Sequence, residues 1–103
     1  MELVYERCSG LDVHKKSVVA CLSTPDAKGQ RHKETRPFST MTQDVLAMLD
    51  WLKAARCTHV AMESTGVFWK PIYNLLEGHF ELLVVNAQHM KAVPGRKVRH
   101  EVA

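Results

Sequence analysis

The chain has 103 residues, of which 46% are hydrophobic and 24% are charged. This length suits one domain, and this composition is that of an ordered globular protein rather than a disordered chain. No run of residues stays apolar over the ~18 positions that a membrane-spanning helix needs, and the first residues lack the pattern of a secretory signal. We therefore expect a cytoplasmic protein with no membrane partner.

The net charge of +3 is unevenly distributed along the chain. Residues 1–50 balance their acidic and basic side chains, so the excess lies in residues 51–103. It is concentrated near the end, in Lys91, Arg96, Lys97 and Arg99. Two interpretations of these residues stay open: a solvated chain end, or a segment that contacts a polyanion. The three cysteines and six histidines match neither a disulfide framework nor a zinc site, so we expect reduced thiols.

The first forty residues have the pattern of three β-strands. Residues 9–24 contain two short β-branched runs around a polar centre, His14-Lys15-Lys16-Ser17, which indicates a hairpin. Residues 25–29 are rich in turn formers, and residues 30–40 alternate polar with apolar or β-branched side chains. Three strands with short links favour an antiparallel meander.

After residue 40 the hydrophobic period becomes helical. Apolar residues from Val45 to Ala55 recur at helical spacing, and Thr40 or Thr42 is a candidate N-cap. Residues 57–63 then predict a buried strand, and residues 64–66 predict a turn in which Ser64 caps the next helix.

A second helix and a last strand complete the chain. The helix is expected to start at Trp69 or Lys70, so that Pro71 falls in its first turn, and to end at Gly78. Residues 81–86 are a short apolar run typical of a parallel strand. The order βββ-α-β-α-β predicts an α/β, ribonuclease-H-like fold: a mixed five-stranded sheet with helices packed on its faces.

Two carboxylates occupy unusual positions in these strands. Asp12 interrupts an apolar first strand and Glu63 ends the fourth, and the predicted topology makes these strands neighbours. A convergent acid pair binds Mg²⁺ through oxygen and, with further acids, supports two-metal cleavage of a phosphodiester. An acidic residue at a strand end is also commonly a solvated edge or a helix cap, so the residues alone leave both interpretations open.

Three motifs add a resemblance that covers residues 8–97. Residues 10–15 read GLDVHK, residues 63–69 read ESTGVFW and residues 94–97 read PGRK. Together they resemble the N-terminal domain of bacterial insertion-sequence transposases of the family numbered one hundred and ten, which is related to Piv-type DNA invertases and described as DEDD recombinases. The resemblance implies a RuvC-like fold and DNA transposition by metal-dependent strand cleavage and transfer. It also implies Mg²⁺ or Mn²⁺ as cofactor, DNA and a structured guide RNA of the element as partners, and a homo-oligomer in the intact protein.

Asp12 and Glu63 match the first two acids of the family's tetrad, which makes them the candidate catalytic and metal-binding residues. Where the family continues with Thr-Asp-x-x-Asp, this sequence has Arg99 and Val102 at the two aspartate positions. We therefore expect residues 1–97 to be an incomplete RuvC-like domain and residues 98–103 a divergent basic tail, as in a truncated or frame-shifted remnant that is inactive in cleavage. Basic residues of the first hairpin and the end of the chain are the candidate nucleic-acid contacts: Lys15, Lys16, Lys91, Arg96, Lys97 and Arg99.

Two other functions compete with a DNA-cleaving domain. One is a non-catalytic remnant that binds nucleic acid or other transposase subunits, and the missing acids favour it for this polypeptide. The other is an ATPase of the actin-like superfamily, which shares the topology and an early aspartate. Such an ATPase needs a glycine-bearing phosphate turn after that aspartate, and His14-Lys15-Lys16 contains no glycine.

Overall fold

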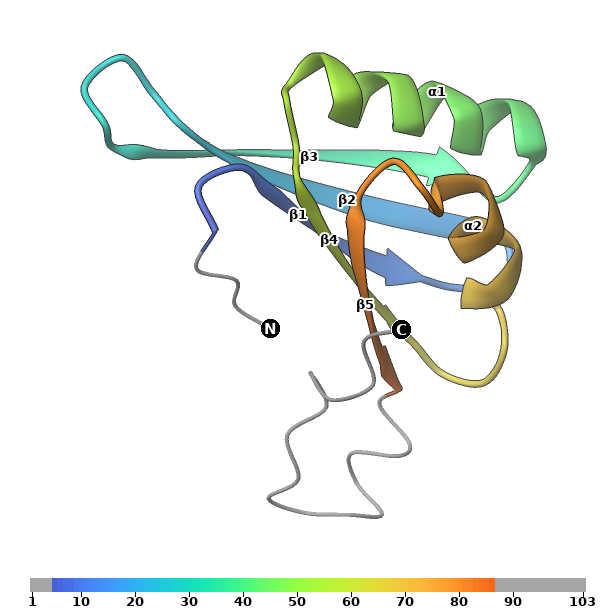
Figure 1. Ribbon diagram of the computed structural model, residues 1–103. Coiled ribbons are helices and arrows are strands. Elements are labelled where there is room, and N and C mark those ends of the chain that lie inside the picture. The colour runs from blue at the N-terminus through green and yellow to red at the C-terminus, as the bar shows by residue number, and fades with distance from the viewer. Residues whose placement is uncertain (1–4, 87–103) are drawn as a thin grey trace, which may run out of the picture.

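The computed structural model of the protein describes residues 5–86. The predicted order of elements is confirmed (Figure 1). The elements are β1 (Cys8–Val13), β2 (Ser17–Pro25), β3 (Arg31–Ser39), α1 (Thr42–Ala54), β4 (His59–Ser64), α2 (Trp69–Leu76) and β5 (Glu81–Asn86). Neither of these helices is long and apolar enough to cross a lipid bilayer.

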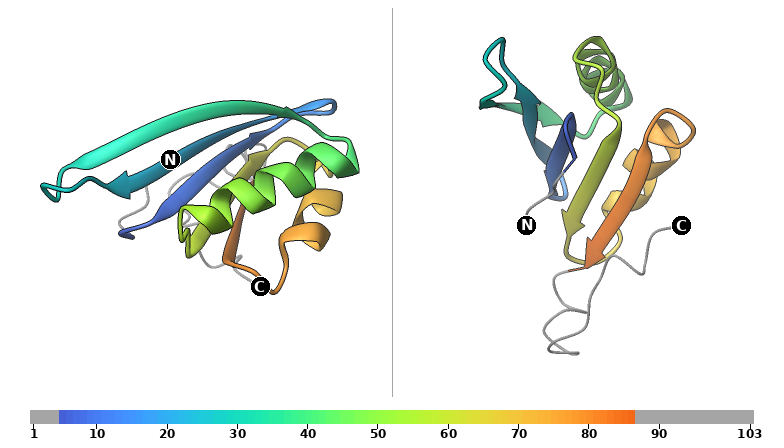
Figure 2. Two further views of the ribbon diagram at one scale, coloured as in Figure 1. Left: turned by 90° about the horizontal axis from the view of Figure 1, so that it is seen from above. Right: turned by 60° about the vertical axis from the view of Figure 1, so that its left-hand side comes forward.

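The five strands form one mixed sheet in the order β3-β2-β1-β4-β5. The β1–β2 and β2–β3 pairs are antiparallel, whereas β1–β4 and β4–β5 are parallel. Both α1 and α2 lie on the same side of this sheet (Figure 2). Because the crossovers from β3 to β4 and from β4 to β5 advance in the same direction, right-handed connections place both helices on one face. The predicted fold class is confirmed, with the difference that the described helices cover one face and leave the other open.

Alternation along the strands separates a core face from this open face. The buried side chains of the core cluster come from the helix-facing positions of the strands and from one stripe of each helix: Leu11, Val13, Val18, Ala20, Leu22, Val45, Met48, Leu49, Leu52, Val60, Met62, Ile72, Leu76 and Leu82. The residues between them in β1 and β4 therefore point to the open face. Asp12 and Glu63 are among these.

The start of α1 differs from the sequence-based expectation. Its N-cap is Met41, which makes no side-chain capping bond. The Ser39 hydroxyl instead accepts a hydrogen bond from the Met41 amide at 3.1 Å and donates to the Asp44 carboxylate in the first helical turn. The expected cap at Thr40 or Thr42 was wrong because the Thr40 hydroxyl bonds the β1–β2 turn and Thr42 already lies within the helix.

The ends of α2 follow from local chemistry. The helix starts at Trp69, so Pro71 is its third residue, where a missing amide hydrogen costs no helical bond. Gly78 follows it with φ of 87°, a left-handed conformation that glycine adopts without steric cost.

Cys57, which links α1 to β4, supplies a test of this core. Burial raises the pKa of its thiol to about 12. Because only the thiolate reacts, a variant in which Cys8 and Cys21 are replaced by serine should be modified by a disulfide reagent at about pH 8 at least ~100-fold more slowly when native than in urea. Equal rates in the two states would show that Cys57 is not buried.

Candidate active site

Asp12 and Glu63 lie side by side near the carboxyl ends of two neighbouring strands. In the parallel β1–β4 ladder they are direct partners, so their Cα atoms are about 5 Å apart. Their neighbours Leu11 and Met62 face the core, and both carboxylates therefore stand on the open face of the sheet. The strand adjacency expected from the sequence is confirmed, and it brings the two candidate acids together.

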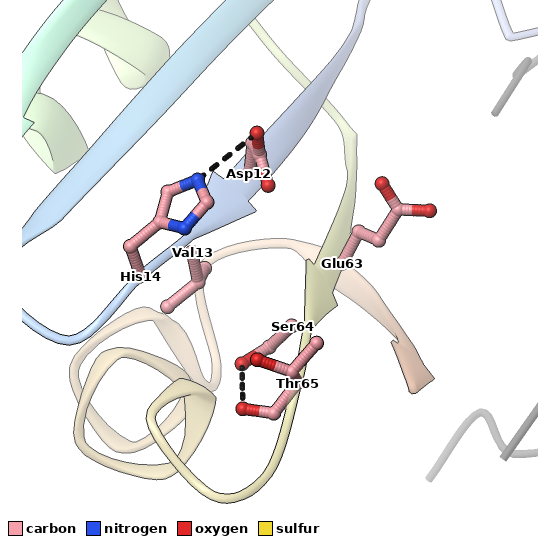
Figure 3. A pocket seen from close by; sticks show the side chains of 6 residues that line it. All are labelled: Asp12, Val13, His14, Glu63, Ser64 and Thr65. Atoms are coloured by element: carbon pink, nitrogen blue, oxygen red, sulfur yellow. Dashed lines mark hydrogen bonds and ion pairs between the residues drawn. The ribbon is translucent and has the colours of Figure 1, made fainter. Parts of the chain in front are cut away.

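An open pocket of about 90 Å³ lies beside the acid pair (Figure 3). Its lining consists of the last residues of β1 and β4 and the residues that follow them: Asp12, Val13, His14, Glu63, Ser64 and Thr65. A water molecule needs about 10–15 Å³ of such space, so the pocket can hold several water molecules or a cation that keeps part of its water shell. Carboxylate oxygens are the ligands that Mg²⁺ prefers, and it binds through one or two of them while retaining water.

The acid pair alone does not make a complete metal site. Within residues 5–86, no three histidine, cysteine, aspartate or glutamate side chains are grouped so that they could hold a metal ion. Asp12 and Glu63 can therefore supply two ligands at most from this part of the chain. Water, substrate oxygens or further acids must supply the others.

His14 lies beside Asp12 of the acid pair. Its Nε2 atom lies 3.2 Å from Oδ2 of Asp12, and both side chains are 58% exposed. Its backbone amide donates to the Ser17 carbonyl at 2.8 Å, which closes the β1–β2 turn and keeps the imidazole near the carboxylate. Contacts between such exposed groups add little stability, so this contact contributes little to holding the fold. The only sequence signal for it was the position of His14 two residues after Asp12.

The candidate nucleic-acid contacts divide into two groups. Lys15 and Lys16 are exposed in the β1–β2 turn, directly after His14. This turn lies at the same end of the strands as the two acids. The other four lie outside the described residues: Lys91, Arg96, Lys97 and Arg99.

One expectation for the segment after β4 is not met. Ser64 does not cap α2: its side chain is buried, and its hydroxyl donates to the Thr65 carbonyl at 3.3 Å. The residue at the N-cap is Phe68, because a four-residue segment separates β4 from α2 and keeps Ser64 too far away. Phe68 is 39% exposed, whereas Trp69 and Tyr73 pack against the core.

Comparison with protein families identifies the chain. Residues 9–101 match the model of the DEDD transposases numbered one hundred and ten, described as transposase. The chain belongs to this transposase family. The match confirms the family resemblance and includes both Asp12 and Glu63. Family membership associates this transposase chain with DNA transposition and recombination, and with divalent metal in general terms. No curated protein matches the sequence.

Solved structures confirm the fold of this transposase domain. RuvC of Thermus thermophilus in complex with a Holliday junction substrate matches with a TM-score of 0.56 and 10% identity, over 84% of this chain and 69% of that chain. A second structure of Thermus thermophilus RuvC matches with a TM-score of 0.54 and 14% identity, over 87% and 70% of the two chains. At these identities the likeness shows a shared RuvC-like fold.

Proposed function

We propose that Asp12 and Glu63 are the carboxylate ligands of a divalent cation, Mg²⁺ or Mn²⁺, in the metal-dependent cleavage and transfer of DNA strands during transposition. The supporting observation is their direct pairing on the open face, where β1 and β4 hold both carboxylates beside one pocket. In such sites the metal activates the attacking oxygen and stabilises the leaving one. The chain's own residues position the ligands of the cation: the two strands hold the carboxylates in place, and His14 orients Asp12.

DNA is the proposed substrate, and the positive charges beside the acid pair support it. Lys15 and Lys16 are placed to bind phosphates next to the pocket, and Lys91, Arg96, Lys97 and Arg99 would add contacts that do not read sequence. The solved RuvC complex contains a Holliday junction, which shows that a protein with this fold binds DNA. A structured guide RNA, a homo-oligomer and a cytoplasmic site of action complete the proposal for the intact transposase.

Manganese binding tests the acid pair directly. Electron paramagnetic resonance of Mn²⁺ titrated with the 103-residue chain should show binding at millimolar concentration. Asp12→Asn and Glu63→Gln should each weaken it by at least about 10-fold, because each removes one of two charged ligands. The matched control is Asp50→Asn, which removes an exposed carboxylate from α1 and should leave binding unchanged. Equal binding by all four proteins would contradict a metal site at Asp12 and Glu63.

We also propose that residues 1–97 form an incomplete RuvC-like domain, followed by a divergent basic tail at residues 98–103. Arg99 and Val102 stand where the resemblance implies the third and fourth acids. Two ions need more carboxylates than Asp12 and Glu63 supply. The 103-residue polypeptide is therefore expected to cut neither duplex nor branched DNA in Mg²⁺ or Mn²⁺, as labelled substrates on denaturing gels would report.

The cleavage assay also separates the two functions that the sequence left in competition. Absence of product together with DNA binding supports a non-catalytic remnant that binds nucleic acid or other subunits. Metal-dependent product that disappears in Asp12→Asn would instead show that this chain is an active nuclease, and the proposed incompleteness would be wrong.

A further inference from the structure

The open face of the sheet carries a second group of side chains, at the end of the strands away from the acid pair. On β3, Phe38 packs against Trp51 of α1, and the Arg36 guanidinium lies 4.7 Å from the centre of the same ring. These even-numbered residues therefore face the helices. Because side chains alternate along a strand, Arg31 and Lys33 must point to the open face.

The sheet register brings these two cations towards β1. Lys33 pairs with Ser23 of β2, and Ser23 pairs with Cys8 of β1. Burial raises the pKa of the Cys8 thiol, and the positive charges of Arg31 and Lys33 act against that rise, as expected if both lie near it. Both cations are exposed, and neither forms an ion pair with a carboxylate of residues 5–86.

An aromatic pair lies on the other side of Cys8. His59 of β4 is the direct partner of Cys8, so it shares the open face. The Tyr5 ring stacks on the His59 ring, with centroids 3.5 Å apart and planes 5° from parallel. The Thr58 hydroxyl lies 2.7 Å from Nδ1 of His59 and restricts the imidazole further. Tyr5 is 45% exposed, so this rigid stack offers aromatic surface to solvent.

We propose that Tyr5, His59, Arg31 and Lys33, here called the amino-end patch, bind a single strand of nucleic acid that crosses the open face towards the acid pair. Exposed aromatic rings stack on unpaired bases, and neighbouring cations bind the phosphates; this combination is typical of single-strand binding surfaces. A duplex would offer the phosphates but not the base faces. Asp12 lies four residue steps along β1 from Cys8, about 13 Å, which a few nucleotides span. The inference rests on the proposed function only for the direction in which the nucleic-acid strand runs, because the contacts of the amino-end patch require no metal.

The test measures binding without metal. The 103-residue chain is titrated in EDTA into fluorescein-labelled oligothymidylate of about 20 nucleotides, over a range of salt concentrations, with anisotropy as the readout. The double variant Arg31→Gln/Lys33→Gln should bind about 10-fold more weakly, and its log–log salt slope should be shallower by about 1.4, because two phosphate contacts are lost. Tyr5→Ser should bind at least about 5-fold more weakly, whereas Tyr5→Phe, which keeps the ring, should bind like the wild type.

Matched controls make the result specific. Lys53→Gln removes an exposed cation from α1, on the covered side of the sheet, and should change affinity by less than about 2-fold. Circular dichroism melts confirm that each variant folds. Unchanged affinity and slope in the double variant, or an equal loss in Lys53→Gln, would overturn the amino-end patch. Two results together would overturn the assignment to single strands. A duplex would bind as tightly as oligothymidylate, and Tyr5→Ser would change the affinity for neither of them. Repeating the titration in EDTA with Asp12→Asn shows whether a loss of binding depends on the acid pair. It therefore separates a failure of the amino-end patch from a failure of the metal site.

Discussion

In millimolar Mg²⁺ or Mn²⁺, the 103-residue chain is expected to melt about 4–8 °C higher than in EDTA. An ion that binds only the folded state adds RT ln(1 + [L]/Kd) to the free energy of unfolding, roughly 1 kcal/mol at about five times Kd. The folded state provides the site because only the β1–β4 register brings Asp12 next to Glu63. Two carboxylates bind an ion weakly, so the shift should need millimolar metal. Calorimetry or circular dichroism measures it.

Asp12→Asn decides whether this shift comes from the acid pair. In the absence of metal, the variant should melt higher than the wild type, because it removes the repulsion between two adjacent negative charges. Addition of metal should then change its melting temperature little. Asp50→Asn, which lacks an exposed carboxylate of α1 instead, should keep the full metal response. Identical responses of the wild type and Asp12→Asn would mean that the two carboxylates do not share a site.

Met62→Ala is expected to lower the free energy of unfolding by about 2–5 kcal/mol. Met62 is completely buried on β4, in the core cluster beneath the helices. Truncating it removes apolar contacts and leaves a cavity, and the melting temperature should fall by about 10 °C or more. Urea denaturation followed by circular dichroism measures the loss. Met41→Ala is the control: Met41 is 70% exposed, and its truncation should change stability by no more than about 0.5 kcal/mol.

This core substitution also tests the candidate site. Met62 and Glu63 are consecutive in β4, so they face opposite sides of the sheet. If Met62→Ala were as stable as the wild type, the helix-facing row of β4 would not be the core. The register that places Glu63 on the open face beside Asp12 would then be wrong, and the proposed metal site would fail with it.

Local sequence patterns determined most of the elements of this protein. Two β-branched runs around a polar centre predicted the first two strands, polar–apolar alternation predicted the third, and the change to helical spacing at Val45 predicted α1. Pro71 and Gly78 placed the ends of α2, because the backbone requirements of these two residue types act over one or two peptide units. The family was also readable from short motifs, and the adjacency of Asp12 and Glu63 followed from the ribonuclease-H-like topology that the element order predicted.

Only the tertiary structure decided how distant side chains meet. The capping partners of α1 depend on how the chain passes from the end of β3 into the helix. Ser39 therefore takes the place of the expected threonines. The amino-end patch joins Tyr5, Arg31, Lys33 and His59 from three separate segments, and no local pattern indicated it. Strand register and the choice of covered face come from packing between segments far apart in the chain, and local propensity contains no information about that packing.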